Sequence, residues 1–305
     1  MQAMLLAAGF GTRLRPHTLV RPKPLFPVLN RPLLDILLDM LEQAGCGRII
    51  VNCHHLADQV RQAAAVRPRV TLQFEPVILG TGGSLRRALP LLADRPLLVM
   101  NGDIFHDIDL RAVYEYHCCS GNAVTMVLHD CPRFNSVAVR RDRVCSFSAP
   151  GPGEKLLAFT GIHVLEPWVI GRIPDNTFYH VIDLYREMAR QGEAIGVMRA
   201  DGGYWRDMGT PEDYLALHRD LLTGRAAIPG RAPVATPWLR GEGVELAGEA
   251  VLEEWGCLGP RVRVGRGVCL RRCVVWEGTR IPGGGTFCDM ILAPHLFVSG
   301  QGGEE

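Results

Sequence analysis

The chain has 305 residues, of which 47% are hydrophobic and 21% charged, and its formal net charge is +1. This length allows one large domain or two unequal ones with a substantial core. The near-neutral charge excludes an extended basic surface for nucleic acid and a polybasic membrane-binding run, and no apolar stretch is long enough to span a bilayer. We therefore expect neither nucleic acid nor a membrane as a partner.

The N-terminal segment carries the first candidate site. An apolar run from Met4 to Ala8 predicts a buried strand that breaks into Gly9-Phe10-Gly11-Thr12-Arg13. Two glycines two apart allow a tight turn whose successive N–H groups form a concave anion site. Arg13, Arg15 and Lys23 add cations that suit phosphate oxygens. The segment predicts a triphosphate-binding loop, although a bare G-x-G fits a structural turn equally well and neither common phosphate-loop pattern is complete.

The following residues, as far as 222, alternate helix and strand signals. Apolar periodicity predicts helices at residues 33–44, 56–65 and 84–92, and strands at 48–52, 70–74 and 96–100. This order is typical of a mixed, mainly parallel sheet covered by helices on both faces, with ligands beyond the carboxyl ends of the strands.

Two aspartates stand at such strand ends. Asp103 follows the strand at 96–100, where a carboxylate is well placed to bind Mg²⁺; a turn or cap role is the alternative. Asp207 ends the strand-like YWRDM, just before a helix start at Thr210. Its alternative role is a buried ion pair with Arg206.

Four residues from Gly80 to Gly83 precede the helix predicted at 84–92. Glycines here permit close approach of a flat base, and Ser84 is a candidate helix cap. A simple glycine helix start is the alternative.

The C-terminal part follows a different pattern. Residues 223–240 are rich in Gly, Pro, Ala and Arg, which predicts a linker. Within 241–295, small or apolar residues then recur at every sixth position, and we call such a set of positions a column. One column has Arg263 as its exception, and a second column occupies the next position along the chain. The first column is Val251, Cys257, Cys269, Val275, Ile281 and Phe287, and the second is Leu252, Leu258, Val264, Leu270 and Trp276. Such a repeat predicts a parallel β-helix, and a stack this short needs capping or a partner surface. We expect a homo-oligomer formed through this part, and a disordered tail at 296–305.

Ten cysteines show no C-x-x-C spacing, and most lie in apolar runs. This composition favours buried free thiols in a reducing compartment over a metal site. The first strand follows Met1 directly, without a basic segment or a cleavage site, so we expect a cytoplasmic protein.

The segment LAAGFGTRLRPHTLVRPKPLFPV, with NGDIF and GGYWRDMGTPEDY further on, resembles sugar-1-phosphate nucleotidylyltransferases (nucleotide-sugar pyrophosphorylases). The likeness is greatest to mannose-1-phosphate guanylyltransferase-like members with a hexapeptide-repeat tail. The resemblance implies a Rossmann-like α/β catalytic domain at 1–222 and a short left-handed parallel β-helix at 241–295. It implies an enzyme of EC 2.7.7 type that converts an NTP and a sugar 1-phosphate into an NDP-sugar and pyrophosphate.

The resemblance also implies roles for individual residues. Arg13 and Lys23 would be catalytic, and Asp103 and Asp207 would bind Mg²⁺ as the cofactor. The implied nucleotide-binding residues are Leu6, Ala8, Gly9, Gly11, Thr12, Gly80, Thr81, Gly82 and Gly83, and the implied sugar-phosphate residues are Asn135, Lys155 and Gly161.

The substrate side departs from the family pattern. Phe134-Asn135-Ser136 stands where the family has Tyr-Gly or Phe-Gly, and Glu154-Lys155-Leu156 replaces Glu-Lys-Pro. The Leu-Gly-Thr-Gly-Gly loop favours guanine, which makes GTP with a mannose- or heptose-type sugar 1-phosphate the first expectation. The alternatives are a uridylyl- or thymidylyltransferase, a cytidylyltransferase for a small phosphate such as phosphocholine, and a non-catalytic nucleotide-sugar sensor.

Overall fold

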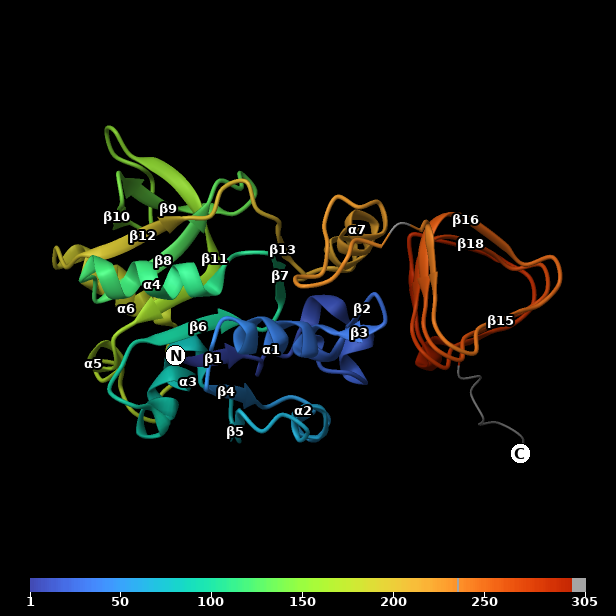
Figure 1. Ribbon diagram of the computed structural model, residues 1–305, viewed down its shortest axis with the longest axis horizontal. Helices are drawn as coiled ribbons and strands as arrows, with labels where there is room; N and C mark the ends of the chain where they lie inside the picture. The colour runs from blue at the N-terminus through green and yellow to red at the C-terminus, as the bar shows by residue number, and fades with distance from the viewer. Residues whose placement is uncertain (235, 298–305) are drawn as a thin grey trace, which may run out of the picture. The chain divides into compact units, whose positions relative to one another are not determined.

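The computed structural model describes residues 1–234 and 236–297. The chain forms two compact units (Figure 1). Unit 1 is Met1–Phe10 with Leu37–Trp205, and unit 2 is Gly11–Ile36 with Arg206 onward. The domain boundaries expected at 222 and 240 remain a prediction, and most of the tail expected at 296–305 lies outside the described residues.

Unit 1 contains a mixed sheet of nine strands in the order β5-β4-β1-β6-β11-β8-β12-β10-β9. These strands are β1 (Gln2–Leu6), β4 (Arg48–Cys53), β5 (Val70–Phe74), β6 (Leu97–Asn101), β8 (Val124–His129), β9 (Asn135–Arg140), β10 (Arg143–Ser146), β11 (Lys155–Leu165) and β12 (Ile195–Arg199). The first four strands in this order pair in parallel, whereas β11 runs antiparallel to both β6 and β8. The expected mixed α/β sheet is confirmed, but the expectation that it is mainly parallel was wrong, because β9, β10 and β11 pair with their neighbours in antiparallel fashion. The strands predicted at 48–52, 70–74 and 96–100 lie within about one residue of their observed bounds.

Helices pack on this sheet through apolar stripes. They are α1 (Leu33–Gln43, beginning in unit 2), α2 (Ala57–Ala64), α3 (Gly80–Ala88), α4 (Leu110–Ser120), α5 (Pro167–Ile170) and α6 (Val181–Arg190). The short strand β7 (Ile104–His106) also belongs to unit 1, and β13 (Trp205–Asp207) begins in unit 1 and ends in unit 2. One core cluster joins α3, α5 and α6 to strand residues such as Met4 and Val99, all fully buried. The helix predicted at 84–92 was wrong in its bounds, because α3 already includes Gly80–Gly83 and ends at Ala88.

Unit 2 begins with three single turns of 3-10 helix (Thr12–Leu14, His17–Leu19 and Lys23–Leu25), followed by a small hairpin. Its regular elements are β2 (Pro27–Val28), β3 (Arg31–Pro32), α7 (Pro211–Leu222), β14 (Trp238–Arg240), β15 (Glu245–Leu246), β16 (Val251–Leu258), β17 (Arg263–Val264), β18 (Cys269–Val275), β19 (Arg280–Ile281), β20 (Thr286–Cys288) and β21 (Ile291–Leu292), with a last 3-10 turn at Pro294–Leu296. The predicted start of α7 is confirmed: Thr210 is the N-cap and its hydroxyl accepts the Asp213 N–H.

The C-terminal strands form two parallel sheets, β14-β16-β18-β20, with β21 also paired to β18, and β15-β17-β19. Val251 pairs with Cys269, eighteen residues later, but Cys269 pairs with Thr286, seventeen later. One residue is therefore lost from the six-residue rhythm. The buried positions therefore belong to the second apolar column as far as Leu270 and to the first apolar column from Val275 onward. Val251, at the start of the first column, is exposed.

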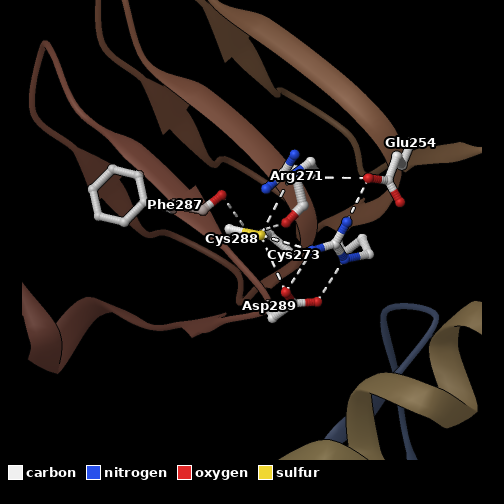
Figure 2. Close-up of polar contacts among 7 residues, drawn as sticks. Glu254, Arg271, Cys273, Phe287, Cys288 and Asp289 are labelled. Atoms are coloured by element: carbon white, nitrogen blue, oxygen red, sulfur yellow. Dashed lines mark hydrogen bonds and ion pairs between the residues drawn. The ribbon is translucent and has the colours of Figure 1, made fainter.

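A corner of these stacked turns is held by charged side chains (Figure 2). Glu254, Arg272 and Asp289 occupy corresponding positions in three turns, each with a positive φ. The Arg272 guanidinium pairs with Glu254 on one side and with Asp289 on the other, at 2.6 Å. Its hydrogen bonds lower the pKa of Asp289 to about 2. The cluster thus links successive turns where the left-handed backbone is unfavourable for ordinary residues.

The N-terminal segment of unit 2 packs against α7 and the parallel sheets through an aromatic cluster. Phe26 lies 4.8 Å from Trp276 and 5.7 Å from Tyr214, measured between ring centroids. Trp276, the last residue of the second apolar column, therefore packs against Phe26. Tyr214 donates its hydroxyl to the Pro27 carbonyl, and the Trp276 indole donates to Tyr214 at 3.3 Å.

Among the described residues no helix is long and apolar enough to cross a membrane. All ten cysteines are free thiols, but only Cys46, Cys53, Cys257 and Cys273 are buried, whereas Cys118 and Cys119 are exposed. The expectation that the thiols are buried was thus wrong for several of them.

His218 of α7 provides a test of unit 2. The ring is fully buried, its Nδ1–H donates to the Tyr214 carbonyl at 3.0 Å, and Nε2 accepts the Leu29 N–H at 3.3 Å. A second ring proton would face that N–H, and burial lowers the pKa of His218 to about 4. Because unfolded histidine titrates near 6.5, we expect the free energy of unfolding to fall as the pH drops from about 6.5 to 4, by roughly 3 kcal/mol from this group.

Urea unfolding of the wild type and of His218→Phe at several pH values measures this loss. The variant is expected to be less stable at pH 7 and to lose less on acidification. Parallel pH curves for the two proteins would contradict the assignment.

Candidate active site

The turn that leaves β1 is fixed by the ends of two neighbouring strands in unit 1. The Leu6 carbonyl accepts the Gly102 N–H at 2.8 Å, and the Ala7 N–H donates to Asn52 Oδ1 at 2.6 Å. Ala8 is buried and Gly9 exposed, with open space where a Gly9 side chain would lie. The main chain at Gly9 is thus accessible to a ligand.

The second part of the predicted loop lies in unit 2 and is tightly folded. Gly11 has φ +61°, and a Cβ there would lie 2.8 Å from Thr18 Cγ2. The Thr18 hydroxyl donates to the Gly11 carbonyl at 3.0 Å. Glycine is therefore required at position 11 by both backbone conformation and space, and Thr12 and Arg13 begin the following turn on the exposed side.

Arg13, Lys23 and Asp207 gather around Gly209 within unit 2. Lys23 is only 7% exposed, and its Nζ lies 3.9 Å from Asp207 Oδ1. A Cβ added at Gly209 would lie 2.5 Å from both Arg13 Nη2 and Asp207 Oδ1. Two cations from the start of the chain and a carboxylate from far along it therefore lie in one small region. Such a region suits a polyphosphate and its counter-ion.

Asp103 lies in unit 1, half-buried in the turn between β6 and β7. Its neighbour Gly102 approaches the backbone so closely that a Cβ would lie 2.8 Å from the Leu6 carbonyl. The aspartate is thus carried at the carboxyl end of a central strand, directly beside the turn after β1.

The glycines at 80–83 have a different environment from the predicted one. They form the first turn of α3, and the Ser84 hydroxyl donates back to the Gly80 carbonyl at 2.8 Å, so Ser84 is not the cap. A Cβ at Gly80 would lie 2.7 Å from the Tyr179 carbonyl, and one at Gly83 would lie 2.5 Å from the Thr177 carbonyl. The close packing of residues 80–83 against residues 177–181 is therefore enough to explain why glycine stands at these positions.

Thr81 and Gly82 take part in the same packing. The Thr81 hydroxyl accepts the Val181 N–H at 3.0 Å, and the Gly82 N–H donates to the Tyr179 carbonyl at 2.8 Å. Their predicted contacts with a nucleotide remain a prediction.

The three predicted sugar-phosphate residues lie on two strands of unit 1, Asn135 on β9 and Lys155 and Gly161 on β11. Asn135 pairs in register with Ala158 and bonds through its side chain to Asp130 and Cys131. Lys155 is exposed at the first position of β11, six residues from Gly161, which is about 20 Å along a strand. The structure does not bring Lys155 and Gly161 together.

Sequence reasoning missed the residues that hold these groups in place. The buried Asn52 amide bonds Ala7, Glu75 and Ser84, and Asn101 packs over Gly161, whose Cβ would meet its amide at 2.7 Å. The available signal was a polar residue at or next to the end of a buried strand, because Asn101 ends β6 and Asn52 is the last residue but one of β4. Gly209 lay inside the quoted motif but was not selected.

The donor groups fit Mg²⁺. Among the described residues no three acidic, histidine or cysteine side chains form a metal cluster by themselves. Mg²⁺ is usually held by only one or two carboxylates together with substrate phosphates and water. Within unit 2, the carboxylate of Asp207 beside the cations of Arg13 and Lys23 matches that donor chemistry, and within unit 1 Asp103 offers one further carboxylate.

The fold and this charge arrangement define an α/β enzyme that acts on phosphate-containing substrates. A family model described as Nucleotidyl transferase matches residues 2–224, and the chain belongs to this family, an enzyme class of EC 2.7.7 type. It is 30% identical to a mannose-1-phosphate guanylyltransferase of Mycobacterium tuberculosis, over 93% of this chain and 82% of that protein. It is also 33% identical to an N-acetylmuramate alpha-1-phosphate uridylyltransferase of Caulobacter vibrioides, over 72% of this chain and 96% of that protein.

Among solved structures, HddC from Yersinia pseudotuberculosis complexed with GMP-PN has the same fold. The TM-score is 0.60 at 23% sequence identity, with 72% of this chain and 98% of that chain covered. The α/β fold implied by the sequence motifs is thereby confirmed.

Gly209 offers a direct test of this region. In Gly209→Ala the new methyl group must displace Arg13 or Asp207, so we expect at least a hundredfold loss of turnover with a destabilisation of roughly 1–3 kcal/mol. Steady-state kinetics and urea unfolding measure the two effects. Gly202→Ala, at an exposed turn with open space around its Cβ, is the control, although its φ of +85° also makes alanine strained. Full activity of Gly209→Ala would contradict the assignment.

Proposed function

We propose that the protein transfers a nucleotidyl group from an NTP, with GTP favoured, to a mannose- or heptose-type sugar 1-phosphate. The products are an NDP-sugar and pyrophosphate. The observation that carries this proposal is the convergence of Arg13, Lys23 and Asp207 around Gly209. A binding module alone has no need for a buried lysine facing a carboxylate at this position.

In this proposal each residue has an electrostatic or positioning role. Arg13 and Lys23 bind the triphosphate and offset the charge that develops on the α-phosphate and on departing pyrophosphate. Asp103 and Asp207 hold Mg²⁺, which when bound neutralises phosphate charge and orients the oxygens for in-line displacement. The sugar phosphate is already anionic at neutral pH, so no side chain has to remove a proton from it. The main chain from Leu6 to Thr12 positions the nucleotide.

Selectivity for the base and the sugar is the finer part of the proposal. Relatives named for guanylyl and for uridylyl transfer both match the chain, which supports nucleotide-sugar synthesis more strongly than it supports either base. We retain guanine because of the Leu-Gly-Thr-Gly-Gly sequence, with a uridylyl- or thymidylyltransferase as the alternative. Transfer of a cytidylyl group to phosphocholine, or a pure sensor role, has no structural observation in its favour.

Pyrophosphate release with Mg²⁺, measured for four NTPs against a panel of sugar 1-phosphates, tests the reaction. We expect release with GTP and mannose or heptose 1-phosphate. Release with UTP and an amino-sugar phosphate would overturn the choice of base and keep the class, and no release with any pair would overturn the proposal.

The same assay tests the metal ligands. Asp103→Asn is expected to abolish turnover while the circular dichroism spectrum stays unchanged. Asp107→Asn is the matched control, because Asp107 follows β7 and accepts the Tyr204 N–H at 2.8 Å. Near-normal activity of Asp103→Asn would remove Asp103 from the metal site.

We further propose that the C-terminal strands form a left-handed β-helix through which a cytoplasmic homo-oligomer assembles. The parallel pairing at intervals of about three hexads supports the β-helix. A hollow of about 520 Å³ on β15-β17-β19, lined by Glu245, Arg263, Arg280 and Phe297 among others, offers both signs of charge and an apolar ring to a second copy.

Light scattering of the full chain is expected to give more than one copy per particle. Arg280→Glu should shift the assembly toward the monomer, with Arg225→Glu as the control. A wild-type protein that is monomeric at all concentrations would contradict the proposed assembly.

A further inference from the structure

A cavity of about 440 Å³ lies within unit 1, at the amino ends of β1 and β4. Its lining includes Gln2 and Arg48 from these strands, Gly47 just before β4, and Ala93 and Arg95 from the chain that leads into β6. Because β1, β4 and β6 run parallel, the turn after β1 lies at the opposite edge of the sheet. A ligand in this cavity would therefore be additional to the substrates of the proposed reaction.

The side chains around this cavity bring positive charge. Arg48 and Arg95 line it, and Arg111 of α4 adjoins it, because a Cβ at the lining residue Gly45 would lie 3.4 Å from Arg111 Nη2. Arg48 donates one N–H to the Leu91 carbonyl. Among the described residues, none of the three guanidinium groups forms an ion pair with a carboxylate. Most of their N–H donors are thus available to a ligand.

The acidic side chains of this region leave that charge largely uncompensated. Asp39 and Glu42, in the last part of α1, both pair with Arg67, at 2.7 and 3.5 Å. Asp94 precedes Arg95 in the chain, but it is exposed and does not line the cavity. A concave surface whose charges have one sign concentrates ions of the opposite sign. The cavity therefore favours an anion.

A buried amide fixes the turn that carries Arg95. Gln2 is 2% exposed, and its Nε2 donates to the Ala93 carbonyl at 3.0 Å and to the Arg95 carbonyl at 2.6 Å. Its Oε1 accepts the Ala93 N–H at 2.9 Å. Both ends of one buried side chain thus hold the main chain of an exposed arginine at the edge of the cavity. A main chain that is already ordered lowers the entropic cost of binding.

The guanidinium groups and the size of the cavity indicate the class of ligand. Guanidinium groups offer paired N–H donors that match the oxygens of a phosphate group, and they stay charged at physiological pH. The volume of about 440 Å³ lies in the range of small-molecule sites. A small phosphorylated molecule meets both conditions.

We propose that this cavity is a binding site for a small phosphorylated anion, held by Arg48, Arg95 and Arg111. Inorganic pyrophosphate and a sugar phosphate share the chemistry that the site recognises, and the experiment distinguishes them. The inference does not rest on the proposed function, because it concerns the other edge of the sheet and needs no turnover.

Protection of single arginines from phenylglyoxal tests the site. Mass spectrometry gives the modification rate of each arginine in the full chain, titrated without Mg²⁺ at constant ionic strength with pyrophosphate or, separately, with mannose 1-phosphate. We expect Arg48, Arg95 and Arg111 to become protected together, at one half-protecting concentration. Arg143 is the internal control, because it is exposed at the start of β10 and forms no ion pair among the described residues, so its rate should stay constant.

Charge variants sharpen the assignment. Arg95→Gln should raise the concentration that half-protects Arg48 and Arg111 about tenfold, as for one lost charge-assisted contact. It leaves the main-chain bonds of the turn in place, so the circular dichroism spectrum should not change. Asp94→Asn should lower that concentration, because it removes a neighbouring negative charge. Arg143→Gln is the matched control and should leave the protection unchanged.

The outcomes decide both the site and its ligand. Joint protection by pyrophosphate alone assigns the site to a diphosphate group, and joint protection by mannose 1-phosphate alone assigns it to a sugar phosphate. No joint protection by either anion overturns the proposal. Equal protection of Arg143, or an unchanged half-protecting concentration in Arg95→Gln, would show only non-specific ion binding and would also overturn it.

Discussion

The turn after β1 depends on one buried amide, the side chain of Asn52. The chain leaves the sheet while still buried, so the Ala7 N–H needs a partner inside the protein, and Asn52 Oδ1 supplies it at 2.6 Å. The amide nitrogen of Asn52 donates to Glu75 at 2.9 Å and to Ser84 at 3.0 Å. One side chain thereby fixes the start of the glycine loop to β4, to the chain after β5 and to α3. A fully satisfied buried network of this kind makes the turn after β1 rigid, as the proposed binding of a nucleotide there requires.

In unit 2, aromatic packing supplies the corresponding rigidity. Phe26, Tyr214 and Trp276 come from three distant parts of the sequence, and their contacts hold the segment that carries Lys23 against α7. Asp207 lies four residues before that helix, whose cap at Thr210 fixes where the helix begins. The positions of Lys23 and Asp207 thus follow from a core that includes the C-terminal parallel sheets. These sheets are therefore part of the support for the Lys23 and Asp207 side chains within this unit.

Much of this arrangement could be predicted from local sequence. Apolar runs such as Arg48–Asn52 and the Thr210 cap depend on neighbouring residues alone, so their elements were identified nearly to the residue. The failures have a common physical cause. The glycines at 80–83 were expected to form a loop because the residues against which they pack, 177–181, lie a hundred positions away. The six-residue repeat also does not reveal that one residue is lost near Cys273, where the inward positions move from one apolar column to the other.

The class of the reaction is also easier to predict from local sequence than the choice of substrate. Phosphates demand charge, and Arg13, Lys23 and the aspartates are recognisable by residue type in a motif. A sugar hydroxyl requires only a neutral donor or acceptor in a dry cavity, and many buried histidines satisfy that description in a sequence. Among the described residues neither ring nitrogen of the buried His163 has a hydrogen-bond partner, whereas His106 accepts the Ile108 N–H and His117 bonds the Thr125 hydroxyl, and no pattern of residues reveals this difference. The hydrogen bonds of a buried neutral side chain are therefore set by the surrounding fold, whereas charged residues in a motif can be recognised from the sequence.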